Sequence, residues 1–250
     1  MSDESRPSPA QTAVAAVIPA AGRGVRLGPG APKALRALNG TPMLIHAVRA
    51  LAASRHVSLV IVVAPPDGAA EVKSLLDAHA LPERTDFLVV PGGESRQESV
   101  RLGLDALPPE YGVVLVHDAA RPLVPVDTVD AVVEAVRAGA PAVVPALPLA
   151  DTVKEVAPAA TAGDPEPVVA TPERARLRAV QTPQGFDRVT LLRAHETVTE
   201  DVTDDASMVE QLGLTVVAVP GHEEAFKVTR PLDLVLAEAV LARRRLNDGF

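Results

Sequence analysis

Short apolar runs alternate with amphipathic segments along the first 148 residues of the chain. Each apolar run has the length and continuous hydrophobicity of a strand buried in a parallel sheet. These runs are residues 13–18, 57–64, 87–90, 113–116 and 142–145. The segments between them carry apolar residues at helical spacing, over 43–51, 67–80, 100–107 and 127–138. Thr41 is predicted as the N-cap of the first of these helices and Pro42 as its first residue. Strand and helix alternate five times, which predicts an α/β fold with a doubly wound, mostly parallel sheet and right-handed crossovers.

The alternation stops after Leu149. Residues 150–156 alternate like a short strand, 157–167 are rich in Pro, Ala and Gly, and 168–178 can return as a second strand. A hairpin that projects from a sheet has little core of its own and tends to pack on another subunit. We therefore expect residues 150–178 to form a β-arm used in a homodimer.

The chain then returns to the body of the protein. We expect a loop over 179–184, helices over 186–198 and 205–212, strands over 215–219 and 226–229, and a closing helix over 231–246. Pro231 in the first turn and the basic residues 243–245 in the last turn both suit that helix. The whole of 12–250 is predicted to be one domain, preceded by a disordered tail over 1–11.

Composition narrows the class of protein. The 250 residues are 47% hydrophobic but only 2% aromatic, so the core must be built from Val, Leu, Ile and Ala. The net charge of −8 argues against a general nucleic-acid or membrane-surface binder. The absence of cysteine excludes disulfides and thiolate metal sites. No apolar run has the length of a membrane span and the start is polar, so we expect a soluble, cytoplasmic protein.

The first predicted strand leads into a loop suited to phosphate. After Pro19 the loop carries four glycines and the cations Arg23, Arg26 and Lys33. Glycines let backbone N–H groups approach an anion, and the cations supply full charges for phosphate oxygens. The loop is not a Walker loop, because Ala34 follows Lys33 where Ser or Thr is required. It is not the dinucleotide fingerprint either, because two prolines prevent a helix from starting directly after the glycines.

Two further loops follow predicted strands, so all three should lie on one rim of the sheet, where α/β sheets bind ligands. Asp118 comes directly after a buried strand, and it could hold Mg²⁺ together with substrate phosphates. An N-cap or a salt bridge to Arg121 fits the same position, and both interpretations stay open. The turn at Gly92 and Gly93 could follow the edge of a flat base, or it could be a plain turn and helix cap. Arg96 is interpreted as an organiser of that loop rather than as a catalyst.

Three other segments have no functional signal in their pattern alone. Thr203 opens an N-cap sequence, Lys227 alternates with apolar neighbours as a solvated edge charge would, and Arg174 lies in a polar stretch with Arg176 and Arg178. Composition and spacing assign none of them a chemical role.

Taken together, however, the motifs resemble a known family. In chain order they read PAAGRGVRLGPGAPK, GGESRQESVRLGL, VHDAARP, DTVK, QTPQGF, TDDAS and FKVTRPLDL. Their succession from residue 13 to about residue 245 resembles the 2-C-methyl-D-erythritol 4-phosphate cytidylyltransferases of non-mevalonate isoprenoid biosynthesis. The resemblance implies a Rossmann-like nucleotidyltransferase fold and a homodimer that exchanges its β-arm. It also implies a reaction, assisted by Mg²⁺ or another divalent cation, that joins CTP and methylerythritol phosphate to give 4-diphosphocytidyl-2-C-methyl-D-erythritol and pyrophosphate.

The same resemblance assigns roles to single residues. Arg26 and Lys33 match the cations that grip the CTP phosphates, and Arg174 and Lys227 match residues that orient the attack. The positions that match the nucleotide site are Ala20, Ala21, Gly22, Gly93, Glu94, Ser99, Asp118 and Ala119, with Asp118 also beside the metal. The remaining positions, which match the site of the sugar phosphate and its surroundings, are Thr152, Thr203, Thr229 and Arg121.

The chain departs from the family pattern in the arm. Its tip, APAATAGDPEPVVA, is longer and richer in Pro and Ala than the family leads us to expect, and Arg174, Arg176 and Arg178 compete for one role. Two alternatives remain open: a cytidylyltransferase acting on ribitol 5-phosphate, and a non-catalytic nucleotide-binding protein.

Overall fold

The parallel half of the central sheet is built around β1 (Ala13–Pro19). β1 pairs in parallel with β4 (Val57–Ala64) on one side and with β6 (Tyr111–Val116) on the other, and β4 pairs in parallel with β5 (Asp86–Pro91). The computed structural model describes residues 12–22, 32–159, 161, 163–199 and 202–248. These strands confirm the α/β class and the parallel sheet that the apolar runs predict.

The other half of the sheet is mixed in direction. β11 (Gln184–Asp187) lies antiparallel between β6 and β7 (Ala142–Pro148), and β10 (Arg178–Val180) pairs antiparallel with the end of β7. β12 (Val216–Pro220) pairs with β7 in parallel. The predicted loop over 179–184 and the predicted helix start at residue 186 are therefore wrong, because this segment supplies two short strands to the sheet before the helix begins.

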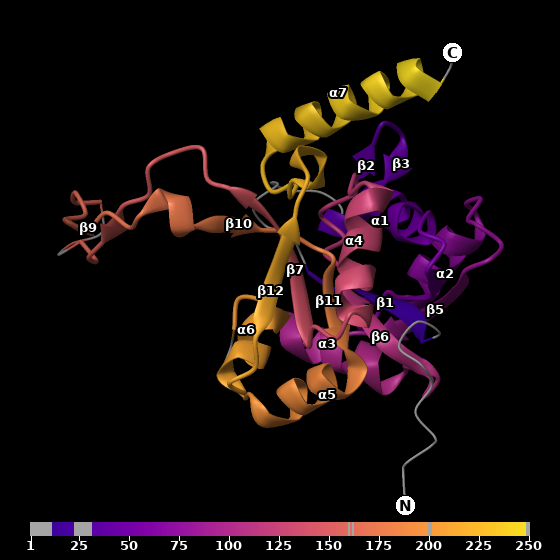
Figure 1. The fold of residues 1–250 in the computed structure, drawn as a ribbon. Helices are drawn as coiled ribbons and strands as arrows, with labels where there is room; N and C mark the ends of the chain where they lie inside the picture. The colour runs from indigo at the N-terminus through magenta and orange to yellow at the C-terminus, as the bar shows by residue number, and fades with distance from the viewer. Residues whose placement is uncertain (1–11, 23–31, 160, 162, 200–201, 249–250) are drawn as a thin grey trace, which may run out of the picture.

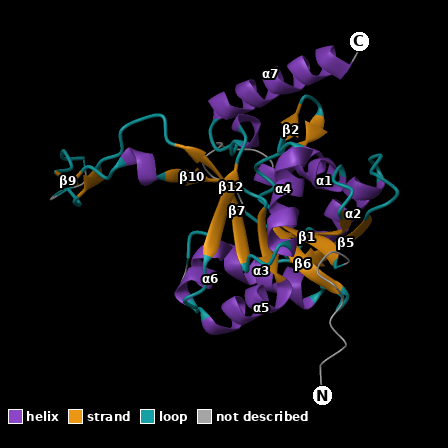
Figure 2. Ribbon diagram, viewed as in Figure 1, coloured by secondary structure: helices purple, strands orange, loops and turns teal. Residues whose placement is uncertain are grey.

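Helices cover both faces of the sheet, as Figures 1 and 2 show. α1, α2 and α4 supply side chains to the core on one face, and α3, α5 and α6 to the core on the other. Their bounds are α1 Met43–Ala52, α2 Ala69–Asp77, α3 Arg96–Asp105, α4 Val126–Arg137, α5 Arg188–Thr197 and α6 Asp205–Gln211. None of the helices within the described residues is long and apolar enough to cross a membrane.

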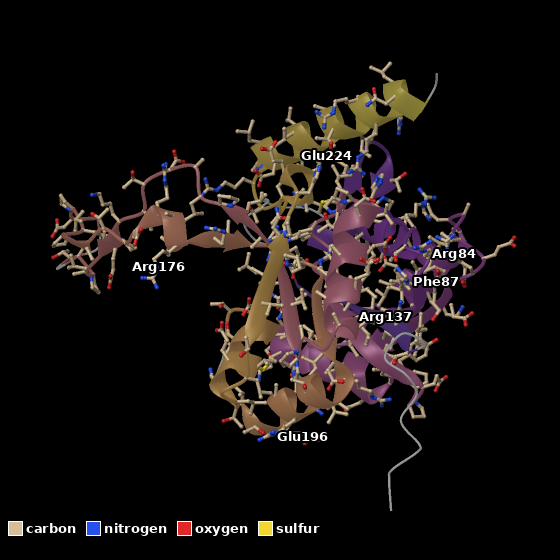
Figure 3. All side chains as sticks on the ribbon, in the orientation of Figure 1. Arg84, Phe87, Arg137, Arg176, Glu196 and Glu224 are labelled. Carbon is tan, nitrogen blue, oxygen red and sulfur yellow. The ribbon has the colours of Figure 1, made fainter. Side chains whose placement is uncertain are left out.

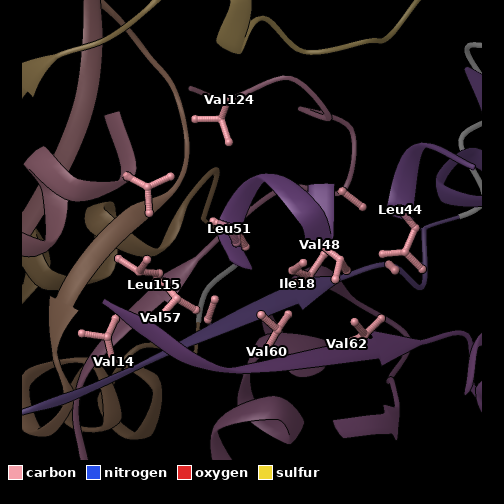
Figure 4. Close-up of a cluster of buried hydrophobic side chains, with 14 of the residues drawn as sticks. Val14, Ile18, Leu44, Val48, Leu51, Val57, Val60, Val62, Leu115 and Val124 are labelled. Carbon is pink, nitrogen blue, oxygen red and sulfur yellow. The ribbon is translucent and has the colours of Figure 1, made fainter. Parts of the chain in front are cut away.

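Aliphatic side chains make up the buried core of the first face, and the partly buried Phe87 packs against it. Val14 and Ile18 of β1 meet Leu44, Val48 and Leu51 of α1, with the valines of β4 beside them (Figure 4). A fully buried Val or Leu contributes about 1.5–3 kcal/mol relative to exposure, so this packing compensates for the scarcity of aromatic residues. The core confirms the composition of Val, Leu, Ile and Ala that the sequence predicts.

A small hairpin precedes α1. β2 (Ala37–Leu38) and β3 (Thr41–Pro42) pair antiparallel across Asn39 and Gly40, both of which have positive φ. Asn-Gly is the preferred pair for this kind of two-residue turn. Because Thr41 belongs to the hairpin, it does not cap the helix. The predicted cap is wrong: Pro42 occupies the N-cap position without a side-chain bond, and the helix begins at Met43.

The arm leaves the sheet at the end of β7 and returns through β10. Its tip pairs β8 (Glu155–Val156) with β9 (Val168–Ala170), and the 3₁₀ turn η4 (Arg174–Arg176) leads back toward the body. Figures 1 and 3 show the arm standing away from the rest of the molecule, with Arg176 on its outer part. The predicted hairpin is confirmed, although its second strand has three residues rather than eleven.

The last part of the chain crosses the rim of the sheet and ends in α7 (Pro231–Asp248). The 3₁₀ turn η5 (Glu223–Ala225) precedes an irregular segment over 226–229, where we predicted a strand. That prediction is wrong because this backbone lies on a loop instead of along a strand: the N–H of Val228 donates to the carbonyl of Ala120.

Candidate active site

The described ends of the first predicted loop meet the other two loops on one rim of the sheet. There they line a cavity of about 250 Å³. Backbone bonds fix the loops to the strand ends: the N–H of Ala20 donates to the carbonyl of Val63, that of Gly92 to Ala64, and that of His117 to Val17, at 2.8–2.9 Å. The lining residues are Pro19, Ala20, Ala21, Gly22, Lys33, Ala34, Gly93, Glu94, Ser95, Arg96, Ser99, Asp118, Ala119, Ala120 and Lys227.

The glycine turn of the second loop passes close to its neighbours. A Cβ on Gly92 would lie 2.8 Å from the carbonyl oxygen of Ala64, so only glycine fits there. The N–H of Gly93 donates to Oγ of Ser99, which places the buried Ser99 under the turn. Ser95 caps α3 by accepting from the N–H of Glu98. This segment is therefore both a helix cap and a backbone edge that faces the cavity.

Asp118 is the carboxylate at the centre of the rim. Its side chain is 12% exposed, and Lys227 Nζ lies 2.7 Å from it, Arg96 Nε 3.6 Å and Arg121 Nε 3.9 Å. Burial alone would raise its pKa, but the charges of Lys227, Arg96 and Arg121 lower the pKa of Asp118 to about 2. The carboxylate is therefore ionised throughout the neutral range.

His117 stabilises the loop that carries Asp118 through hydrogen bonds of both ring nitrogens. Its Nε2–H donates to the carbonyl of Arg121, its Nδ1 accepts from the hydroxyl of Thr182, and that hydroxyl accepts from the N–H of Asp118. This closed set of bonds requires the neutral imidazole. Burial lowers the pKa of His117 to about 4, in agreement with that requirement.

Lys227 reaches the rim because its segment is tied to the same loop. The guanidinium of Arg121 donates to the carbonyl of Ala225 at 2.7 Å, and three residues later the N–H of Val228 donates to the carbonyl of Ala120. The lysine that pattern alone would describe as a solvated edge charge is thus the nearest cation to Asp118. Arg121 itself is not a lining residue; it positions the segment that carries Lys227.

The sequence motifs gave Arg96 no chemical role, but its place in the cavity makes it a candidate functional residue. It lines the cavity from the first turn of α3, next to Asp118 on one side and the buried Asp205 on the other, at 2.8 Å from the latter. The sequence does place Arg96 directly after the glycine turn, but it carries no sign of the two carboxylates that the fold brings to it.

Several of the predicted site residues lie elsewhere. Arg26 is outside the described residues. Thr229 lies before α7, where its N–H and hydroxyl both donate to the carboxylate of Asp233 in the first turn of that helix. Thr203 is exposed before α6, and Thr152 and Arg174 are exposed on the arm, where Arg174 donates to the carbonyl of Ala150. None of these four described residues lines the cavity.

The described part of the site can be compared with the ligand sets that hold metal ions in proteins. Within the described residues, no group of three or more His, Asp or Glu side chains gathers in a way that could hold a metal ion. Among the described residues, the carboxylates that line the cavity are Glu94 and Asp118. Mg²⁺ is commonly bound by one or two carboxylates and substrate phosphates.

These features define a class. A largely parallel α/β sheet with helices on both faces, whose rim presents a glycine-bearing backbone, Lys33, Lys227 and the ionised carboxylate of Asp118, is the arrangement of a nucleotidyltransferase. The model of the family "2-C-methyl-D-erythritol 4-phosphate cytidylyltransferase" matches residues 14–243. The chain belongs to this family, which confirms the resemblance carried by its motifs.

Individual relatives and solved structures support membership in this cytidylyltransferase family. The chain is 88% identical over 250 residues to the 2-C-methyl-D-erythritol 4-phosphate cytidylyltransferase of Streptomyces avermitilis and 83% identical over 270 aligned positions to that of Streptomyces coelicolor, each over 100% of both chains. Among solved structures it resembles the 4-diphosphocytidyl-2C-methyl-D-erythritol synthase of Anaerococcus prevotii, with a TM-score of 0.77 at 27% identity, over 92% of this chain and 99% of the other. It also resembles the Thermus thermophilus cytidylyltransferase, with a TM-score of 0.69 at 34% identity, over 90% and 97% of the two chains.

Proposed function

We propose that the rim cavity binds CTP and that a phosphate oxygen of 2-C-methyl-D-erythritol 4-phosphate attacks the α-phosphorus of CTP there. The observation that carries this proposal is the meeting of the glycine turn, Lys33, Asp118 and Lys227 around one cavity. The backbone at 20–22 and 93–94 faces the nucleotide, and the cations face its phosphates.

The reaction needs positioning and charge rather than a general base. One P–O bond forms to the α-phosphorus, the bond to the β-phosphate breaks, and pyrophosphate leaves with the electron pair. The attacking phosphate is already an anion, so no proton has to be removed. Two anions repel, and catalysis of this kind rests mostly on orientation and electrostatic stabilisation. Lys33, with Arg26, is assigned to the CTP phosphates, and Lys227 to the sugar phosphate.

Asp118 is the residue that would hold Mg²⁺ beside the triphosphate. A single buried but ionised carboxylate fits a cation that arrives with the nucleotide. The ion supplies neutralisation of the charge on the triphosphate when it is bound. Lys227, now 2.7 Å from Asp118, is 40% exposed and can turn from the carboxylate toward an incoming phosphate.

Lys227→Ala tests the assigned roles. Loss of the ammonium should raise the KM for methylerythritol phosphate at least tenfold, because a charge-assisted bond to phosphate is lost, and should raise the KM for CTP much less. Steady-state kinetics with each substrate varied in turn measures both constants. Equal effects on the two KM values, or none, would remove Lys227 from the sugar-phosphate site.

The arm leads us to propose a homodimer in which each arm completes the site of the partner. Thr152 and Arg174 match sugar-phosphate positions, yet both lie on the arm, outside the cavity of their own chain. The exposed Val156, Val168 and Val169 on its tip also suit an interface. The body of one copy and the arm of another would then form each site.

Mixing two inactive variants tests the shared site. Lys33→Ala damages only the body and Arg174→Ala only the arm, so a mixed dimer keeps one intact site. After subunit exchange we expect about a quarter of wild-type activity, since about half of the dimers are mixed. Activity no higher than the sum of the separate variants would contradict a site shared between copies.

We further propose that the enzyme works in the cytoplasm. The chain has no cysteine, and its predicted substrates, a nucleotide and a phosphorylated polyol, are water-soluble metabolites. Fractionation of cells expressing the full chain would test this, because recovery with membranes would contradict it.

A further inference from the structure

The cations around Asp118 differ in how firmly they are held. Lys227 is 40% exposed, and among the described residues Asp118 is the only carboxylate within ion-pair distance of it. Arg96 instead has a second carboxylate, because its guanidinium lies 2.8 Å from Asp205 as well as 3.6 Å from Asp118. A planar guanidinium can bridge two carboxylates in a fixed geometry, which an ammonium cannot do. Arg96 is therefore the anchored cation of the pair and Lys227 the movable one.

The anchor itself is buried. The side chain of Asp205, at the start of α6, is 0% exposed, and that of His195 on α5 is 2% exposed. His195 Nε2 donates to Oδ1 of Asp205 at 3.1 Å, while Arg96 lies on Oδ2 of the same carboxylate. α5 and α6 pack on the face of the sheet opposite to α1. The pair of Asp205 and His195 therefore connects the core of the α5–α6 face to the rim.

The start of α6 does not need this carboxylate. Asp204 already occupies the N-cap and accepts from the N–H of Ser207. A buried charge is costly unless it is paired, and it contributes little net stability even then. The role that the contacts give to Asp205 is thus to hold Arg96.

We propose that Asp205, itself held by His195, is a positioning residue that fixes Arg96 and thereby keeps the carboxylate of Asp118 in place when Lys227 leaves it for a substrate phosphate. This inference rests on the proposed function. Without Arg96, the departure of Lys227 would deprive a nearly buried carboxylate of its two closest cations, and Asp118 would either turn away or hold Lys227 back.

A double-mutant cycle on kcat/KM for CTP tests this positioning role. Asp205→Asn keeps the size of the side chain but removes the charge, and we expect it to lower kcat/KM about 10–100-fold, as loss of outer partners does in other sites. Arg96→Ala should have a similar effect. Because Asp205 acts through Arg96, the double variant should be no more than about threefold worse than Arg96→Ala alone. A product of the two single effects would overturn the proposal.

Two controls separate positioning from general damage. Asp204→Asn removes the neighbouring carboxylate while Asn remains a good N-cap, so kcat/KM should stay within about threefold of the wild type. His195→Gln keeps a donor for Asp205 and should retain most activity, whereas His195→Leu, of similar size, should lower kcat/KM about tenfold. Equal activities of the Gln and Leu variants would contradict the proposal, even if Asp205→Asn failed to fold.

Measurements on the wild type, made together with those on the variants, distinguish failure of the proposed function from failure of the positioning role. If the wild type releases no pyrophosphate from CTP and methylerythritol phosphate, the proposed function fails. If the wild type is active but the cycle shows independent effects, only the positioning role fails.

Discussion

At the scale of single residues, neighbouring charges and burial determine the protonation states of the side chains on the rim. Asp118 is nearly buried, yet nearby cations hold its pKa at about 2, so its carboxylate is ionised at neutral pH. The sequence indicated Asp118 as a candidate because a carboxylate follows a buried strand. Pattern and spacing did not indicate Lys227, which only the family resemblance singled out, because its position depends on the bonds of Arg121 to Ala225 and of Val228 to Ala120.

Lys33→Ala should reduce turnover about 10²–10³-fold, because removal of one preorganised group that stabilises transition-state charge has this effect. The fold should remain intact, since Lys33 lies on a short 3₁₀ turn at the rim. Initial rates together with a thermal melt check both statements. Lys73→Ala is the matched control: Lys73 forms only an exposed pair with Asp77 on α2, and its loss should leave turnover unchanged. Near-normal turnover of Lys33→Ala would remove it from the catalytic role.

Titration of His117 makes the free energy of unfolding depend on pH between about 6.5 and 4. Its folded pKa of about 4 lies below the unfolded value of 6.5, so on acidification the unfolded chain takes up a proton before the folded protein does. Its contribution is fully present above pH 6.5 and is lost as the pH falls toward 4. We expect the free energy of unfolding to decrease by about 2 kcal/mol between pH 7.5 and pH 5 through this group.

Urea denaturation at the two pH values measures that decrease. The variant His117→Asn can still accept the bond from Thr182 but does not titrate, so its unfolding free energy should fall less over the same interval. The partly buried His46, whose pKa burial also lowers, titrates in both proteins and cancels in the comparison. An equal decrease in wild type and variant would show that His117 is not the responsible group.

At the scale of elements, the regular parts of the sheet could be predicted because long apolar runs and helical spacing repeat along the chain. β11 could not, because its four residues, QGFD, contain no β-branched side chain. It becomes a strand by lying between β6 and β7, with Phe186 fully buried on one face. The segment over 226–229 shows the opposite error: it alternates like a strand but crosses the rim, so no neighbouring strand is there to pair with it.

The packing of α3 on the sheet depends on Gly103. A Cβ at this position would lie 2.6 Å from Cγ1 of Val17 and 3.0 Å from Cγ2 of Val63. Gly103→Ala should therefore destabilise the protein by about 1–2 kcal/mol, because overpacking outweighs the higher helix propensity of Ala. Urea denaturation measures the change. In a Val17→Ala background the cost of Gly103→Ala should shrink, and a stabilising effect in the wild-type background would contradict this account of the packing.

At the scale of the whole molecule, the site is assembled from parts that are far apart in the sequence. Lys33, the turn at Gly93, Asp118 and Lys227 come from four separate segments that meet only because strands of one sheet end on one rim. That rim could be predicted from the topology, and the family from the order of the motifs. Periodicity could not assign a role to Thr152 or Arg174, because both are exposed on the arm and neither lines the cavity.

The negative net charge of the protein limits where anionic substrates can bind. At a net charge of −8, the molecule as a whole repels anionic substrates, so their binding must come from the cations gathered at the rim. Loss of Lys33 or Lys227 should therefore affect the reaction without affecting the fold.

The most direct test of the central claim is the initial rate of pyrophosphate release with CTP and Mg²⁺, with methylerythritol 4-phosphate and ribitol 5-phosphate offered in parallel. We expect rapid release with methylerythritol 4-phosphate, little with ribitol 5-phosphate, and loss of release in Lys33→Ala. Release mainly with ribitol 5-phosphate would keep the chemistry but reject the substrate. No release with either substrate, from a folded protein that still binds CTP, would contradict the catalytic role of the rim.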